Sequence, residues 1–129
     1  MDHCTIIDPL IASSVGLDVR PVQLDVTDAS QRATVVADIV REHGRIDGLV
    51  NNAGVALGGF LEQVEEDEIR KVFEVNVFGL WALTREVLPH MRLAQSGTIV
   101  NISSASGFMA FPGLGVYSAS KFALEGMTE

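Results

Sequence analysis

The sequence predicts an α/β domain with a parallel sheet, and three features carry this prediction. Strand-like and helix-like segments alternate three times along the 129 residues. The segment at 97–104 is a nearly continuous apolar run, the pattern of a strand that is covered on both faces. Polar residues follow each strand-like segment, where parallel sheets bind their ligands. We therefore expect parallel strands with helices packed on both faces of the sheet.

The first strand and helix are predicted at 18–44. Residues 18–26 carry β-branched side chains and run into Thr27 and Asp28, which favour the start of a helix. Apolar residues then recur at helical spacing up to Gly44, a residue that commonly ends helices. This pattern predicts a strand at 18–26 followed by a helix.

The second and third repeats occupy the rest of the chain. A short apolar strand at 47–54 runs into an Asn/Gly turn, and a helix follows from about Glu65 to Met91. The acidic start of that helix suits the positive end of its dipole. The strand at 97–104 then precedes a closing helix from about Tyr117.

Composition limits the classes of protein that the chain can represent. The formal net charge of −8 disfavours nucleic acid and anionic membranes as partners, and no apolar run is long enough for a membrane span. The start of the chain lacks the features of a secretory signal, and Cys4 has no second cysteine to pair with. We therefore expect a cytoplasmic protein. His3, His43 and His90 are isolated from one another, so we expect no metal site.

One polar residue interrupts the apolar stripe of the predicted helix at 65–91. Asn76 lies in register with the apolar residues Ile69, Val72, Phe73, Leu80, Leu83 and Val87. A buried amide is destabilising unless it is hydrogen-bonded. Local satisfaction by backbone or water and a functional role both remain open.

Four short motifs follow one another in the second half of the chain. They are "NNAG" at 51–54, "VNVFG" at 75–79, "IVNISS" at 99–104 and "YSASK" at 117–121. Together they resemble the short-chain dehydrogenase/reductase family from about residue 18 to the end. The resemblance implies an incomplete Rossmann-like, doubly wound parallel sheet whose strands correspond to the third, fourth and fifth of the family fold. It also implies an NAD- or NADP-dependent oxidoreductase that interconverts an alcohol and a carbonyl by hydride transfer. The closing segment is similar to hydroxysteroid and retinol dehydrogenases, but it is too short to name a substrate.

The chemistry of such a reaction explains the spacing of Tyr117 and Lys121. The two residues lie one turn apart on one helix face. A proton must reach or leave the substrate oxygen, and a tyrosine with a pKa of about 10 is a weak base near neutrality. A nearby ammonium favours the phenolate. Such a pair alone is more often a solvated surface pair, but together with Ser104 and the Asn-Ala-Gly turn we interpret it as a proton-transfer device.

The resemblance implies a role for each catalytic candidate. Tyr117 would be the general acid/base, and Lys121 would also hold the nicotinamide ribose. Ser104 would hydrogen-bond the substrate oxygen and stabilise its developing charge. Asn76 would continue a proton relay from Lys121 through water.

The resemblance also implies the cofactor contacts. Asp25 and Val26 would contact the adenine, and Asn52, Ala53 and Gly54 would line the path of the cofactor, with Tyr117 and Lys121 at its nicotinamide end. Asp25 has an alternative role as part of the cap of the next helix.

Several alternatives stay open in the loop after the third strand. Ser103 and Ser106 are alternatives for the active hydroxyl. A hydrolase that uses Ser104 would need His and Asp partners, which are not evident. Met109 and Phe111 either line a substrate pocket or pack against the core.

The chain also departs from the family pattern. We expect residues 1–129 to form a single partial domain with an atypical segment at 1–17, because no glycine-rich phosphate-binding turn is found before residue 18. In the strand order of the fold, two strands would be missing between 18–26 and 47–54. We therefore expect this chain alone to bind the cofactor weakly.

An alternative function follows from the same departure. The chain could be a catalytically inactive, truncated member that retains an interaction surface. In the family, the helices that correspond to 65–91 and 117–129 commonly form a dimer interface, so we expect a homo-oligomer. The preference between NAD and NADP and the identity of the substrate are left open by the sequence.

Overall fold

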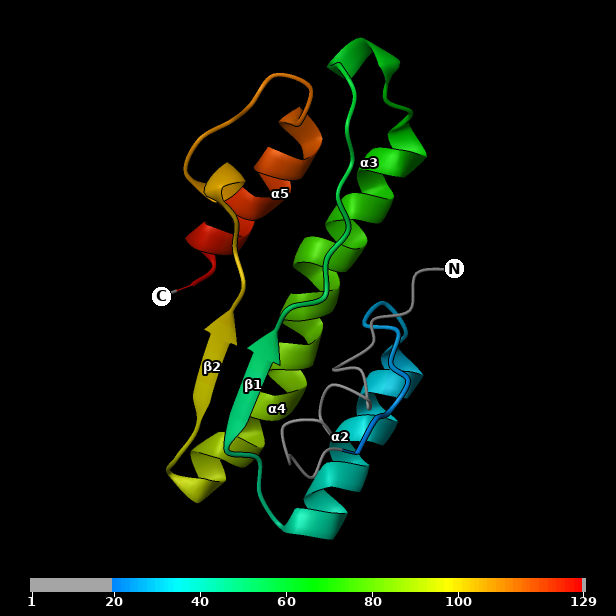
Figure 1. The fold of residues 1–129 in the computed structure, drawn as a ribbon. Helices are drawn as coiled ribbons and strands as arrows, with labels where there is room; N and C mark the ends of the chain where they lie inside the picture. Colours follow the sequence, from blue (N-terminus) through cyan, green and yellow to red (C-terminus); the bar gives the residue numbers. More distant parts are fainter. Residues whose placement is uncertain (1–19, 129) are drawn as a thin grey trace, which may run out of the picture.

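A computed structural model describes residues 20–128 and shows two parallel strands beside a set of helices (Figure 1). η2 is a π-helix, and η1 and η3 are single 3-10 turns. In chain order the elements are α2 (Ala29–His43), β1 (Gly48–Asn51), η1 (Leu61–Gln63), α3 (Glu66–Phe73), η2 (Glu74–Gly79), α4 (Leu80–Ala94), β2 (Thr98–Asn101), η3 (Ala105–Gly107) and α5 (Gly115–Gly126).

The two strands pair in parallel, as the alternation of strands and helices predicts. Leu49 lies opposite Ile99 and Asn51 lies opposite Asn101. The Ile102 N–H donates to the Asn51 carbonyl at 2.9 Å, which continues the pairing beyond the end of β2. Because both strands end at the same edge, the segments that follow them start side by side.

A small apolar core lies between the sheet and the helices. Val36 of α2 and Val87 of α4 are buried, with Leu49 and Ile99 of the strands packed against them. On the opposite face of the sheet, Val50 and Val100 are 62% and 43% exposed. The incomplete α/β fold is thus confirmed. Among residues 20–128, however, the helices cover only the face that carries Leu49 and Ile99, and not both faces as expected.

The predicted strand at 18–26 is wrong for the residues that the structure describes. Within 20–26, only Leu24 carries a bridge, and a turn begins at Val26. Pro21 has no N–H to donate to a ladder. The side chain of Asp25 also bonds to Thr27, which favours a turn over an extended strand. The segment at 1–17 lies outside the described residues.

The helix predicted to end at Gly44 is confirmed as α2. Asp28 is its N-cap, and its carboxylate accepts from the amides of Ser30 and Gln31 at 2.8 and 3.1 Å. The hydroxyl of Ser30, followed by these backbone amides, holds the pKa of Asp28 below its ordinary value. Gly44 ends the helix with a φ of 74°, a left-handed conformation that suits glycine.

The long helix predicted at 65–91 is confirmed as one helical run, in which α3, η2 and α4 follow without a break. The amide of Glu65 donates to the Glu68 carboxylate at 3.0 Å, which caps the acidic start. The sequence pattern did not reveal the π-helical segment η2, which lies in the middle of the run and contains Asn76. Among residues 20–128, no helix has the length and apolar character to span a membrane.

Candidate active site

Asn76 is fully buried, with 0% of its surface exposed, and all of its amide donors are used. Its Oδ1 accepts from the Val55 N–H at 2.8 Å. Its Nδ2 donates to the Val55 carbonyl at 2.9 Å and to the Ser120 Oγ at 3.0 Å. The side chain thus joins η2 both to the segment after β1 and to α5. Because both amide protons are taken, this side chain would take part in a proton relay only by accepting a hydrogen bond from a water at the remaining lone pair of Oδ1.

The π-helical segment places Asn76 and also contacts the loop before α2. A Cβ atom on Gly79 would lie 2.9 Å from the Val26 carbonyl oxygen and 3.0 Å from the Val26 Cγ2. Glycine is therefore required there for the close approach of η2 to Val26. π-Helical turns are rare, and they often occur at functional sites.

Lys121 and Tyr117 lie on the same face of α5, as the sequence predicts. The Lys121 Nζ is 5.9 Å from the centre of the Tyr117 ring. Lys121 is buried, and its Nζ donates to the Ile102 carbonyl at 2.9 Å, which anchors the side chain just beyond β2. Tyr117 is half-buried. The pair is therefore a fixed element at the edge of the sheet and not a solvated surface pair.

Gly54 brings the turn after β1 into the same cluster. A Cβ atom placed on Gly54 would lie 3.4 Å from the Asn76 Oδ1 and 3.8 Å from the Lys121 Nζ. The bare backbone of Gly54 therefore faces both polar groups. Asn52 is exposed and Ala53 is half-buried, so the residues of this turn line an open edge beyond the carboxyl end of β1.

The three candidate hydroxyls of the loop after β2 differ in their surroundings. Ser104 caps η3, with its Oγ accepting from the Ser106 N–H at 3.2 Å, which leaves its proton for another acceptor. The Ser103 Oγ is buried without a partner and is so close to Gly107 that a Cβ there would lie 2.6 Å from it. Ser106 is buried. Ser104 is half-buried and keeps free hydrogen-bonding capacity, on the turn that packs against α5.

Asp25 lies in a different kind of environment. Its carboxylate accepts from the N–H and the hydroxyl of Thr27 at 2.9 and 2.7 Å, and the side chain is exposed. Val26 is buried, and its carbonyl accepts from the Arg32 Nη1 at 2.6 Å. These contacts fit the alternative role of Asp25 as part of the cap of the next helix, because they belong to the turn that leads into α2.

Two polar residues of this edge had no role assigned to them from the sequence. Ser120 is fully buried and bonds to Asn76. Asn51 is buried, and its Nδ2 donates to the Thr84 Oγ1 at 3.0 Å and to the Asn101 Oδ1 at 2.8 Å. The sequence held two signals for these residues. Asn51 and Asn101 occupy matching positions in the two strand motifs, and Ser120 is a small polar residue three positions after Tyr117.

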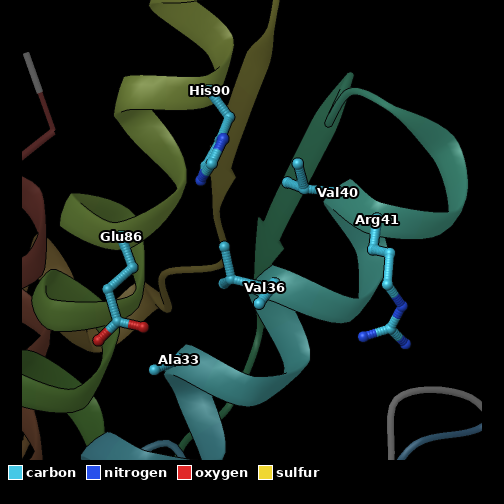
Figure 2. A pocket seen from close by; sticks show the side chains of 7 residues that line it. Ala33, Val36, Val40, Arg41, Glu86 and His90 are labelled. Atoms are coloured by element: carbon cyan, nitrogen blue, oxygen red, sulfur yellow. The ribbon is translucent and has the colours of Figure 1, made fainter.

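A separate groove of about 430 Å³ lies between α2 and α4, away from this cluster (Figure 2). Its α2 wall is apolar except for Arg41, and its α4 wall carries Glu86 and His90. The lining residues are Ala33, Val36, Ala37, Val40, Arg41, Glu86 and His90. None of the candidate catalytic residues contributes to it. Among residues 20–128, no group of three His, Cys, Asp or Glu side chains could hold a metal ion.

Asn76 bonds to the segment after β1, Lys121 bonds to the segment after β2, and Ser104 caps the turn that follows β2. The chain belongs to the short chain dehydrogenase family, whose sequence model matches residues 8–129. Among characterised relatives, it is 46% identical over 111 residues to a 3-ketodihydrosphingosine reductase of Bacteroides thetaiotaomicron. That alignment covers 86% of this chain and 41% of the relative.

Solved structures agree with this assignment. A short-chain dehydrogenase from Streptomyces avermitilis aligns with a TM-score of 0.86 at 42% identity, over 93% of this chain and 44% of that one. A short chain dehydrogenase/reductase from Burkholderia phymatum, in complex with NAD, aligns with a TM-score of 0.84 at 32% identity, over 92% and 42% of the two chains. ElxO with NADP bound aligns with a TM-score of 0.80 at 39% identity, over 83% and 44%. The chain therefore spans less than half the length of these proteins.

Proposed function

We propose that the chain is part of an NAD- or NADP-dependent oxidoreductase that interconverts an alcohol and a carbonyl. The observation that carries this proposal is the meeting of Gly54, Asn76 and Lys121, with Tyr117 one turn away, at the carboxyl ends of β1 and β2. Membership of the family and the reductase among the relatives support it.

The residues present fit a nicotinamide cofactor. The bare backbone of Gly54 leaves room beside the Lys121 ammonium, a donor that suits the hydroxyl groups of a ribose. The cofactor would supply or accept the hydride. Solved relatives of comparable similarity hold NAD in one case and NADP in another, so either dinucleotide is proposed. Asn52 and Ala53 would line its path, and Asp25 and Val26 would contact its adenine.

In the proposed mechanism, Tyr117 transfers the proton to or from the substrate oxygen. Lys121 is held by the Ile102 carbonyl and supplies positive charge near the phenol. Ser104 keeps a free hydroxyl proton and would donate it to the same substrate oxygen. Asn76 would hold a water of the proton relay at its Oδ1, which accepts a hydrogen bond from that water, and it fixes the segment after β1 through Val55.

The edge around these residues favours a neutral, apolar substrate. Residues 48–61 and 98–120 contain no Asp, Glu, Lys, Arg or His, although charged residues make up 20% of the chain. Phe60, Phe108, Met109 and Phe111 are exposed on the two loops of this edge, which the hydrogen bond from Gly59 N–H to the Gly113 carbonyl joins. Met109 and Phe111 therefore do not pack into the core, which supports the pocket-lining alternative.

The test is cofactor-dependent reduction of a neutral ketone, with Tyr117→Phe as the variant. Loss of the phenol proton should lower kcat by about 10²- to 10⁴-fold, because general acid catalysis contributes that much. Tyr117 is the only tyrosine of the chain, so the variant removes every phenol. An unchanged kcat in Tyr117→Phe would contradict the proposed role.

A second candidate is a non-catalytic function through a dimer surface. Phe78, Trp81 and Phe122 are exposed on η2, α4 and α5, within the helices expected to form an oligomer. Large exposed aromatic side chains are typical of interfaces. Light scattering of the chain and of Trp81→Ser and Phe122→Ser tests this candidate, because both variants should shift a dimer towards the monomer. A monomeric unsubstituted chain would exclude it.

A further inference from the structure

We propose that Ser120 is a positioning residue of this site, whose hydroxyl fixes the backbone at Tyr117 relative to Asn76. The proposal rests on the proposed function, since positioning is defined relative to the proton transfer at Tyr117. Ser120 does not need to touch substrate or cofactor in this role.

The hydroxyl of Ser120 makes two bonds in a fully buried place. It donates to the Tyr117 carbonyl at 2.7 Å and accepts from the Asn76 Nδ2 at 3.0 Å. A serine that bonds back to its own helix is common. The bond from another element distinguishes Ser120, because it ties this helix to a residue 44 positions away.

The bonds of Ser120 extend through Asn76 to the end of β1. Asn76 exchanges two hydrogen bonds with the backbone of Val55, so the order of contacts is Val55, Asn76, Ser120, Tyr117. Lys121, the next residue along α5, is fixed separately through the Ile102 carbonyl beyond β2. The two halves of the proton-transfer pair are thus fixed to the ends of the two neighbouring strands by different bonds.

Removal of the Ser120 hydroxyl would leave an Asn76 amide proton without an acceptor inside the protein. The carbonyl of Val55 can satisfy only one of the two protons in the present geometry. A buried donor without a partner is unfavourable, so the amide and α5 should shift to reduce that cost. Small displacements of catalytic groups can lower rates up to a hundredfold.

Ser118 provides a matched control on the same helix. It is also buried, at 1% exposed, but its Oγ has no hydrogen-bond partner. Ser118→Ala and Ser120→Ala remove the same atom from two buried positions of α5. They differ in whether that atom links Asn76 to the helix.

The experiment measures kcat and KM of the 129-residue chain with NADH or NADPH and a neutral aliphatic ketone. Ser120→Ala should lower kcat about tenfold and change the KM values less than about twofold, because misplacement affects the chemical step. Ser120→Cys keeps a weak donor and acceptor of similar shape, so it should recover part of the loss. Ser118→Ala should keep both constants within about twofold of the unsubstituted chain. Equal losses in the two alanine variants, or an unchanged kcat in Ser120→Ala, would overturn the proposal.

A second measurement separates this proposal from the proposed function. Thermal unfolding of Asn76→Ala, Ser120→Ala and the double variant forms a cycle that needs no turnover. If the two residues are linked, Ser120→Ala should lower the melting temperature clearly less in the Asn76→Ala background than alone. Additive shifts would overturn the link even in an active enzyme. Absence of turnover by the unsubstituted chain would count against the proposed function, and the cycle would still decide whether Ser120 links Asn76 to α5.

Discussion

The edge at α5 and the turn at 25–28 are both expected to contact the cofactor, yet they are built differently. At the α5 edge, Asn76 bonds to Val55 and Ser120, which are 21 and 44 positions away in sequence. In the turn, Asp25 bonds to Thr27, two positions on. Long-range bonds between buried polar groups hold an arrangement in place before any ligand arrives, whereas local bonds stabilise only the path of the chain. The comparison indicates that the α5 edge is the preformed part of the proposed site.

The largest difference between the two regions is expected when Asn76→Ala is compared with Asp25→Ala. Asn76→Ala leaves the part-buried N–H and carbonyl of Val55 and the fully buried Ser120 hydroxyl without their partner, and it should reduce the free energy of unfolding by about 3 kcal/mol. Asp25→Ala removes exposed local bonds and should cost less than about 1 kcal/mol. Urea denaturation of the two variants measures both values. Equal losses would remove the distinction between the two regions.

Gly79→Ala tests the contact between the two regions, where η2 lies against Val26. The added Cβ would meet the Val26 carbonyl oxygen at 2.9 Å, so either η2 or the loop must move, at a cost of about 2 kcal/mol. Gly126→Ala, at the end of α5, is the control, because a Cβ there has nothing within 4 Å. It should leave stability unchanged or raise it by up to about 1 kcal/mol. A tolerated Gly79→Ala would mean that the loop at Val26 is not held against η2.

The smallest effect on stability is expected from Asp28, the N-cap of α2. The pKa of Asp28 is held below its ordinary value, so its ionised form contributes stability above the unfolded-state pKa, which is near 3.9. That contribution is lost as the pH falls through the folded-state pKa of Asp28. Asp28→Asn keeps a capping side chain and removes the titration. Its unfolding midpoint should therefore fall less between pH 5 and pH 2 than that of the unsubstituted chain, and an equal fall would contradict the role of this carboxylate.

Local patterns predicted most of the fold. The end of α2 followed from Gly44 and the start of α3 from its acidic residues, since capping depends on a few adjacent side chains. Within 20–26, the part of the predicted strand that the structure describes, no strand forms, because β-branched composition is a weak signal and Pro21 and Asp25 favour other conformations.

The sequence predicted which residues make up the proposed site, but it did not predict the hydrogen bonds that hold them. Spacing placed Tyr117 and Lys121 on one helix face, and the apolar stripe singled out Asn76. The π-turn at Asn76 and the bond to Ser120 depend on elements brought together only by folding, so no local pattern could reveal them. Lys121 was predicted to pair with Tyr117, but its anchor on the Ile102 carbonyl was not.

The most direct test of the account is a fluorescence titration of the chain with NADH and NADPH. The unsubstituted chain, Lys121→Ala and Lys71→Ala should be compared, with folding checked by circular dichroism. Lys71 lies exposed on α3 and is the only other lysine of the chain, so it is the matched control. The unsubstituted chain should bind weakly and saturably. Lys121→Ala should weaken binding at least about tenfold, since one charge-assisted hydrogen bond is lost, and Lys71→Ala should leave it within about twofold. Equal binding by all three folded chains, or no saturable binding by the folded unsubstituted chain, would contradict the assignment of this edge as a cofactor site.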